Sequence, residues 1–166
     1  MIQRIQTVLL LAVAVCMGMI LAYFIWAEVN ENNSTVAVMT AFKMEVIDTA
    51  GTLQDKSDDS VISTTSVWYI GVLAIAASLV AILSVFQFKN RLNQMKLGAL
   101  NALIMAATLG LSYYNIAQFE KTINPELQGN IQAGFFFPAA AMILNILANR
   151  FIRKDEKLVK SVDRIR

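Results

Sequence analysis

The chain has 166 residues, of which 57% are hydrophobic and 16% charged, and its net charge is +2. Soluble domains carry roughly a quarter charged residues, so this composition argues against a soluble globular protein. The sequence contains no histidine, the most common metal ligand and general base, and its one cysteine, Cys16, supports neither an intramolecular disulfide nor a metal site.

The first apolar segment predicts a transmembrane helix over about residues 8–26. It carries no charge, and its length is close to the roughly 20 apolar residues that cross a hydrocarbon core. A secretory signal peptide has a shorter apolar region, and this segment ends in the bulky residues Tyr23, Phe24 and Trp26, which favour the membrane–water interface. We therefore expect an uncleaved helix.

The outer loop that follows, residues 27–66, is the one extramembrane segment long enough to fold locally. Its sequence DTAG predicts a turn, and SVISTTSVWY suits a returning strand. We expect at most a small β-hairpin here, packed on the helix ends or on a partner, because an isolated hairpin is only marginally stable in water. The expected strand has apolar residues at one parity, which is typical of a half-buried strand: Val36, Val38, Phe42, Met44 and Val46.

Three further apolar segments predict helices over about residues 67–88, 97–117 and 133–152. Pro138 lies in the last one, where it removes a backbone hydrogen bond, which membrane helices tolerate when neighbours satisfy the freed carbonyl. Residues 153–166 then form a basic tail. The sequence thus predicts an all-α membrane protein, a single four-span domain over residues 1–166 whose helices form a compact bundle.

The distribution of basic residues predicts the orientation of these helices. Only Lys43, Lys56 and Lys121 lie on one side of the predicted spans. All the other basic residues lie on the opposite side, which also holds both termini. Short loops rich in lysine and arginine stay in the cytoplasm, so this opposite side should be cytoplasmic. That side carries Arg4, Lys89, Arg91, Lys96, Arg150, Arg153, Lys154, Lys157, Lys160, Arg164 and Arg166.

Polar residues inside the predicted spans are few, and none of them well inside a span is charged, which argues against an ion-coupled transporter. On the third predicted helix, four polar residues project within about 60° of one another: Asn101, Thr108, Ser112 and Asn115. This stripe either forms interhelical hydrogen bonds, the interpretation we favour, or lines a small cavity or substrate groove. In both cases it should face protein.

The basic tail has an amphipathic pattern. As a helix it gathers apolar side chains on one face, with most basic ones elsewhere: Phe151, Leu158, Val162 and Ile165. Such a helix can simply anchor the topology, lie on an anionic membrane surface, or dock on a cytosolic partner. The first of these three roles is the simplest.

Three stretches of the sequence resemble a known family: the start MIQRIQTVLLLA, the inner loop FKNRLNQMKL and the tail LANRFIRKDEKLVKSVDRIR. Together they are similar to a Bacteroidota family of small four-helix inner-membrane proteins, domain of unknown function 4293, over essentially the full chain. The resemblance implies a bacterial inner-membrane location and four helices, and it implies no substrate. It rests on RKDEKLVKS and DRIR in the tail and on Asn90, Arg91, Gln94, Lys96, Leu97, Asn149 and Arg150.

The inner loop combines positive charge with amide side chains, which supply directional hydrogen bonds. A signal for topology alone would need only the charge. We therefore hypothesise a cytoplasmic interaction patch that binds either the chain's own tail or a partner subunit. Its members are Asn90, Arg91, Gln94, Lys96, Asn149 and Arg150.

The sequence shows no nucleophile paired with a base, no phosphate-binding glycine loop and no nucleic-acid-reading module. We therefore expect no enzymatic activity, no catalytic, cofactor-binding or metal site, and no nucleic-acid partner. The leading interpretation is a non-enzymatic inner-membrane protein that serves as an accessory or scaffold subunit of a larger membrane complex. The alternative is a small transporter or channel that uses the polar stripe. Expected partners are the lipid bilayer, other membrane-protein subunits, and anionic lipid contacted through the basic tail.

Overall fold

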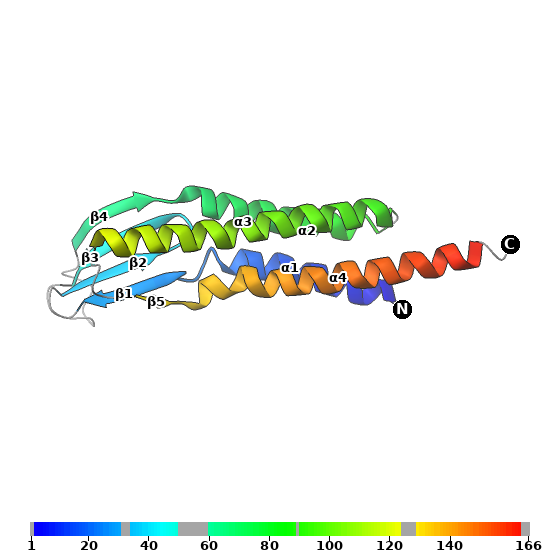
Figure 1. The fold of residues 1–166 in the computed structure, drawn as a ribbon, viewed down its shortest axis with the longest axis horizontal. Helices are drawn as coiled ribbons and strands as arrows, with labels where there is room; N and C mark the ends of the chain where they lie inside the picture. Colours follow the sequence, from blue (N-terminus) through cyan, green and yellow to red (C-terminus); the bar gives the residue numbers. More distant parts are fainter. Residues whose placement is uncertain (1, 31–33, 50–59, 89, 124–128, 164–166) are drawn as a thin grey trace.

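Four helices form an elongated bundle with a small β-sheet at one end (Figure 1). The computed structural model describes residues 2–30, 34–49, 60–88, 90–123 and 129–163. The helices are α1 (Ile2–Met19), α2 (Trp68–Phe86), α3 (Arg91–Ile123) and α4 (Ala133–Asp163). Both chain termini lie at the end of the bundle away from the sheet, and we call the two ends the terminal end and the sheet end.

The helices pack so that α1 and α3 each contact both α2 and α4. Small residues allow α2 to approach its neighbours closely, since Ala74, Ala77 and Ala81 are fully buried. The Ser78 hydroxyl of α2 donates a hydrogen bond to the Ala14 carbonyl of α1 at 3.0 Å. Close packing and interhelical hydrogen bonds therefore act together inside the bundle.

Among the described residues, three helical segments are long and apolar enough to cross a membrane: Trp68–Phe86, Arg91–Thr122 and Ala133–Val159. The apolar part of α1, Ile5–Met19, is shorter. α3 extends beyond the predicted span 97–117 at both ends, and α4 continues through Pro138 and past residue 152 to Asp163. Most of the predicted tail is therefore a direct continuation of α4 rather than a separate helix.

The prediction of an all-α fold is wrong, because the structure contains a five-stranded sheet in the order β4-β3-β2-β1-β5. All its neighbouring strands are antiparallel. The sheet draws on both loops at the sheet end and is larger than the small hairpin expected in residues 27–66. Its strands are β1 (Trp26–Asn30), β2 (Thr35–Met39), β3 (Lys43–Asp48), β4 (Ser60–Ser66) and β5 (Asn130–Ile131).

The first predicted helix, 8–26, differs from the structure because its last residues belong to the sheet. α1 ends at Met19, and the Ile25 N–H donates to the Met39 carbonyl at 2.8 Å as the chain enters β1. Ile25 and Trp26 are both fully buried. The β-branched and aromatic side chains that resembled the end of a membrane helix are also those that favour a strand, and pairing with β2 gives them a buried site.

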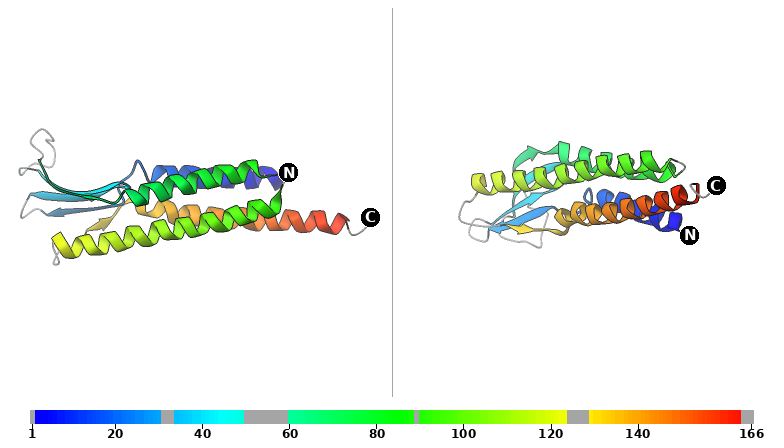
Figure 2. Two further views of the ribbon diagram at one scale, coloured as in Figure 1. Left: turned by 90° about the horizontal axis from the view of Figure 1, so that it is seen from above. Right: turned by 45° about the vertical axis from the view of Figure 1, so that its right-hand side comes forward.

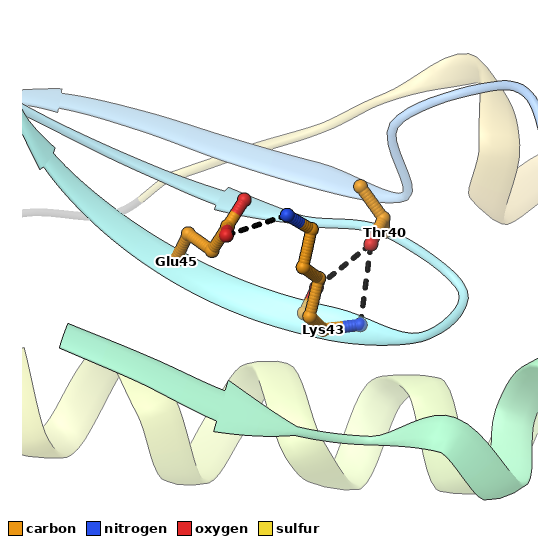
Figure 3. Close-up of polar contacts among 3 residues, drawn as sticks. All are labelled: Thr40, Lys43 and Glu45. Carbon is orange, nitrogen blue, oxygen red and sulfur yellow. Dashed lines mark hydrogen bonds and ion pairs between the residues drawn. The ribbon is translucent and has the colours of Figure 1, made fainter. Parts of the chain in front are cut away.

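The expected single strand is in fact a hairpin of β2 and β3. As a result, the apolar residues expected on one face of the strand are divided between the two faces of the sheet. Val36 and Val38 pair with Ile47 and Glu45, so they lie on the opposite face from Met44. The turn between the strands is closed by Thr40, whose hydroxyl donates to the Lys43 carbonyl at 2.9 Å and accepts from the Lys43 N–H at 3.2 Å (Figure 3). An ion pair of 2.6 Å between Lys43 and Glu45 lies beside this turn.

Backbone hydrogen bonds attach the sheet to the bundle at the N-termini of two helices. The tip of the β2–β3 hairpin meets the start of α2, where the Val67 and Gly71 N–H groups donate to the Phe42 and Ala41 carbonyls, both at 2.8 Å. At the start of α4, the Gly134 N–H donates to the Phe24 carbonyl at 2.9 Å. N–H groups at the start of a helix lack partners within the helix, so these three carbonyls satisfy the three N–H groups and connect the sheet to the bundle.

Candidate functional site: polar contacts at the two ends of the bundle

The α2–α3 turn at the terminal end carries most of the hypothesised interaction patch. Asn90 caps α3, because its side-chain oxygen accepts a hydrogen bond from the Asn93 N–H at 3.2 Å. Gln94 is buried, and its amide nitrogen donates to the Ser84 carbonyl of α2 at 3.0 Å. Both amides therefore fix the local geometry of the turn between the two helices.

Arg91 links this turn to the C-terminal part of α4. Its guanidinium donates to the Asp155 carbonyl at 2.8 Å and forms an ion pair with the Asp155 carboxylate at 3.0 Å. The side chains of Arg91 and Asp155 are only 22% and 15% exposed, so the pair is partly shielded from solvent. The inner loop thus contacts the chain's own C-terminal helix through Arg91.

Two asparagines of α4 pack against Gly98 of α3. The Asn145 amide is fully buried and donates to the Gly98 carbonyl at 2.8 Å. A side chain at position 98 would overlap the Asn149 amide. The structure therefore brings Asn149 together with α3, while Lys96 and Arg150 remain exposed at the surface.

The predicted polar stripe of α3 faces the interior of the bundle. Asn101, Thr108 and Ser112 are almost completely buried. Thr108 donates to the Ile104 carbonyl of its own helix at 2.9 Å, and Asn115 accepts a hydrogen bond of 2.7 Å from the Tyr69 hydroxyl of α2. Neither polar atom of the Asn101 side chain, nor the Ser112 hydroxyl, has a hydrogen-bond partner among the described residues.

The predicted apolar face of the tail is described only in part. Phe151 is half-buried and Leu158 is 50% exposed, so the two differ in environment. Val162 lies in α4 but its side chain is not described, and Ile165 lies outside the described residues. The fully buried residue of this region is Ile152, which lies outside the predicted set.

A second polar site, at the sheet end, was not predicted from the sequence. Trp26 of β1 is fully buried, and its indole N–H donates to the Glu120 carboxylate of α3 at 3.1 Å. The same carboxylate oxygen accepts from the Gly129 N–H at 3.3 Å, and the Phe119 ring packs edge-to-face against Trp26. In Figures 1 and 2, the last turns of α3 run beside the sheet, where these contacts form. The site joins residues that are distant in sequence, since Trp26 and Glu120 are 94 positions apart.

Glu28, two residues along β1, is also buried, and one of its carboxylate oxygens lacks a partner among the described residues. Burial raises the pKa of Glu28, and the nearby negative charge of Glu120 raises it further. The sheet end thus holds two carboxylates with different roles. Glu120 accepts hydrogen bonds, whereas burial and the charge of Glu120 make the ionised form of Glu28 less favourable than that of an exposed glutamate.

These contacts are structural, and in the described part of the chain no group of three His, Cys, Asp or Glu residues is placed to hold a metal ion. The fold and the sites define a class of protein: a four-helix bundle, with three helices apolar and long enough to cross a membrane, that carries an antiparallel sheet at one end. The chain belongs to the family described as Domain of unknown function (DUF4293), whose model matches residues 2–165. No curated protein matches it significantly.

Proposed function

We propose that the protein is a non-enzymatic integral protein of the bacterial inner membrane that serves as an accessory or scaffold subunit of a larger complex. The apolar belt around the bundle supports the membrane location. On α2 alone, Val72, Ile75, Leu79 and Leu83 are all exposed along one side of the helix, and contiguous exposed apolar side chains of this kind mark a membrane or protein contact. With the positive side inside, the terminal end is cytoplasmic and the sheet is periplasmic.

The observation that carries the scaffold role is strand β4. All seven of its residues are exposed, including Val61 at 57% and Ile62 at 59%, and among the described strands it pairs only with β3. An exposed edge strand offers unpaired backbone N–H and C=O groups, and natural proteins usually protect such edges. A partner that adds a strand or an apolar surface at β4 would use these groups.

The attachment of the sheet supports the same role. Hydrogen bonds at the starts of α2 and α4, together with the Trp26–Glu120 contact to α3, fix the sheet to three of the four helices. A docking surface held in this way loses little conformational freedom when a partner binds, which favours affinity.

The alternative, a small transporter or channel, is favoured by one observation, the buried Asn101 side chain without a described partner. Replacing Asn101 and Asn115 with leucine separates the two functions. A transporter would lose flux of its solute while keeping its fold, whereas a scaffold would lose stability or partners.

The direct test is to purify the tagged chain at native abundance in a mild detergent and to identify co-purifying proteins by mass spectrometry. We expect a partner in fixed ratio. The variant Val61→Lys with Ile62→Lys should lose it, whereas Leu158→Lys with Val159→Lys, which adds the same charge at exposed sites of the terminal end, should retain it.

Two results would contradict this proposal. Recovery of the wild-type chain alone, as a monomer or homo-oligomer, would argue for transport or lipid handling instead. Loss of the partner in the Leu158 and Val159 variant, but not in the Val61 and Ile62 variant, would move the docking surface away from β4.

A further inference from the structure

A surface hollow of about 580 Å³ lies along the C-terminal half of α4. Its described lining consists of Ile146, Asn149, Arg150, Arg153, Lys154 and Lys157. These residues are spaced three or four apart, or are neighbours, so they share one face of the helix. Four of the six are cations, none is acidic, and all four cations are exposed.

The cationic face continues an apolar one. Toward the middle of α4, the exposed side chains are Ile143, Ile146 and Leu147, which belong to the segment long enough to cross a membrane. At a rise of about 1.5 Å per residue, Arg150 lies about 6 Å beyond Ile146 and Lys157 about 16 Å beyond it. A lipid at this surface would therefore place its acyl chains on the isoleucines and its phosphate among the cations.

One lining residue, Asn149, is polar and is held in position by α3. Asn149 packs its amide against Gly98 of α3, and its side-chain oxygen has no partner among the described residues. The Arg91–Asp155 contact fixes this part of α4 to the α2–α3 turn. The cations are therefore carried by a part of α4 that contacts α3 and the α2–α3 turn.

Clustered cations of this kind are mutually repulsive at helical spacings of three and four residues. An anion among them relieves that repulsion, and basic pockets at the cytoplasmic side of membrane helices suit phospholipid headgroups. We propose that this hollow binds the headgroup of an anionic glycerophospholipid from the leaflet at the terminal end. The inference rests on the proposed membrane placement but not on the subunit role.

The test uses the purified full-length protein in mild detergent and native mass spectrometry with added phosphatidylglycerol, cardiolipin or phosphatidylethanolamine. We expect the two anionic lipids to bind at least tenfold more tightly than the zwitterionic one. Arg150→Gln with Arg153→Gln should weaken that binding at least tenfold. The matched control, Lys43→Gln with Lys121→Gln, removes the same charge at exposed sites away from the hollow and should change it less than twofold.

Equal binding of phosphatidylethanolamine, or equal loss in both double variants, would overturn the proposal, since either would reflect nonspecific attraction. Displacement of the lipid by millimolar inorganic phosphate would assign the hollow to a free anion instead. If the hollow variant fails to fold, Lys157→Glu, at the site furthest from the bundle, replaces it. Wild-type lipid affinity in that folded variant would also count against the site. Lipid binding is measured without any partner protein, so failure here is distinct from failure of the scaffold role.

Discussion

At the sheet end, backbone groups join the sheet to the starts of α2 and α4, with one side-chain contact from Trp26 to α3, whereas at the terminal end side chains join one helix to another. The carbonyls of Phe24, Ala41 and Phe42 satisfy N–H groups at the starts of α4 and α2. At the other end, Arg91, Gln94 and Asn145 make the contacts between helices.

This difference has a physical basis. Backbone groups must be satisfied wherever water is excluded, so their contacts tolerate many sequences but little displacement. Side-chain contacts depend on the individual residues, and the charged ones among them weaken when salt screens the charges. We therefore expect the sheet end to be the more rigid and stable part, and the terminal end to respond more to salt, lipid and substitution.

The largest effect should come from Trp26, the centre of the sheet-end core. Trp26→Ala removes a fully buried indole and its hydrogen bond to Glu120, and should cost about 3–5 kcal/mol of unfolding free energy. The matched control is Trp68→Ala, at a site 59% exposed, which should cost no more than about 1 kcal/mol. Denaturant unfolding in mild detergent, followed by circular dichroism, measures both. Equal losses of unfolding free energy in the two variants would show that the sheet-end core does not dominate the stability of the protein.

A smaller loss is expected from Gly134, where α4 meets the backbone before β1. A Cβ at this position would overlap the Phe24 carbonyl, so Gly134→Ala should cost about 1–3 kcal/mol. Gly110→Ala is the control, because its Cβ would meet no atom within 4 Å, and alanine should gain up to about 1 kcal/mol in the helix. Thermal unfolding compares the two. If Gly134→Ala left the unfolding temperature unchanged, the attachment of the sheet to α4 would be easily displaced, contrary to the expectation of a rigid sheet end.

The Arg91–Asp155 contact tests the terminal end, where side chains make the contacts between helices. A double-mutant cycle of Arg91→Ala and Asp155→Ala should give a coupling energy of about 1 kcal/mol, because the pair is partly buried. The coupling should shrink in high salt, unlike the loss at Gly134. The control cycle of Lys96→Ala with Asp155→Ala should show no coupling. A salt-independent value would contradict the contrast drawn between the two ends.

The smallest effect is a pH dependence at the sheet end. Because the folded-state pKa of Glu28 is raised above its ordinary value of 4.5, the folded state binds a proton more tightly than the unfolded state. This contribution to stability is fully present below about pH 4.5 and is lost as the pH rises through the folded-state value. Glu28→Gln should therefore be more stable than wild type at pH 8, with the difference fading toward pH 4.5. Denaturant unfolding of both proteins across this pH range measures the difference, and a difference that does not change with pH would contradict the prediction.

The helices were predictable from sequence because long apolar segments have few alternatives to a helix in a membrane. The sheet was predictable only in part: the expected returning strand is β4, which pairs antiparallel with β3, but β1 begins within the first apolar segment and β5 contains only two residues. The chain also turns at Thr40, so apolar residues before and after it lie on opposite faces of the sheet. The alternation of apolar residues continues through this turn and gives no sign of it. The length of a segment predicts a span, but strand partners are set by contacts distant in sequence.

The candidate sites divide in the same way. The sequence grouped Arg91, Gln94 and Asn149 into one patch, since amides and charge clustered near two helix ends. The structure gives each of them a separate partner, Asp155, Ser84 and Gly98, respectively, and leaves the patch as a prediction. Glu120 gave no local signal, because its role depends on Trp26, distant in sequence and brought close by the sheet.

We propose that the sheet and the chain termini lie on opposite sides of the inner membrane, and site-specific labelling tests this placement most directly. Ser63 on β4 and Ser161 on α4 are both exposed, and Cys16 is the only native cysteine. In a Cys16→Ser background, a membrane-impermeant maleimide applied to spheroplasts should label Ser63→Cys at once. It should label Ser161→Cys only after the membrane is permeabilised. Labelling of both positions in intact spheroplasts, or of Ser161→Cys alone, would contradict the membrane orientation on which the account depends.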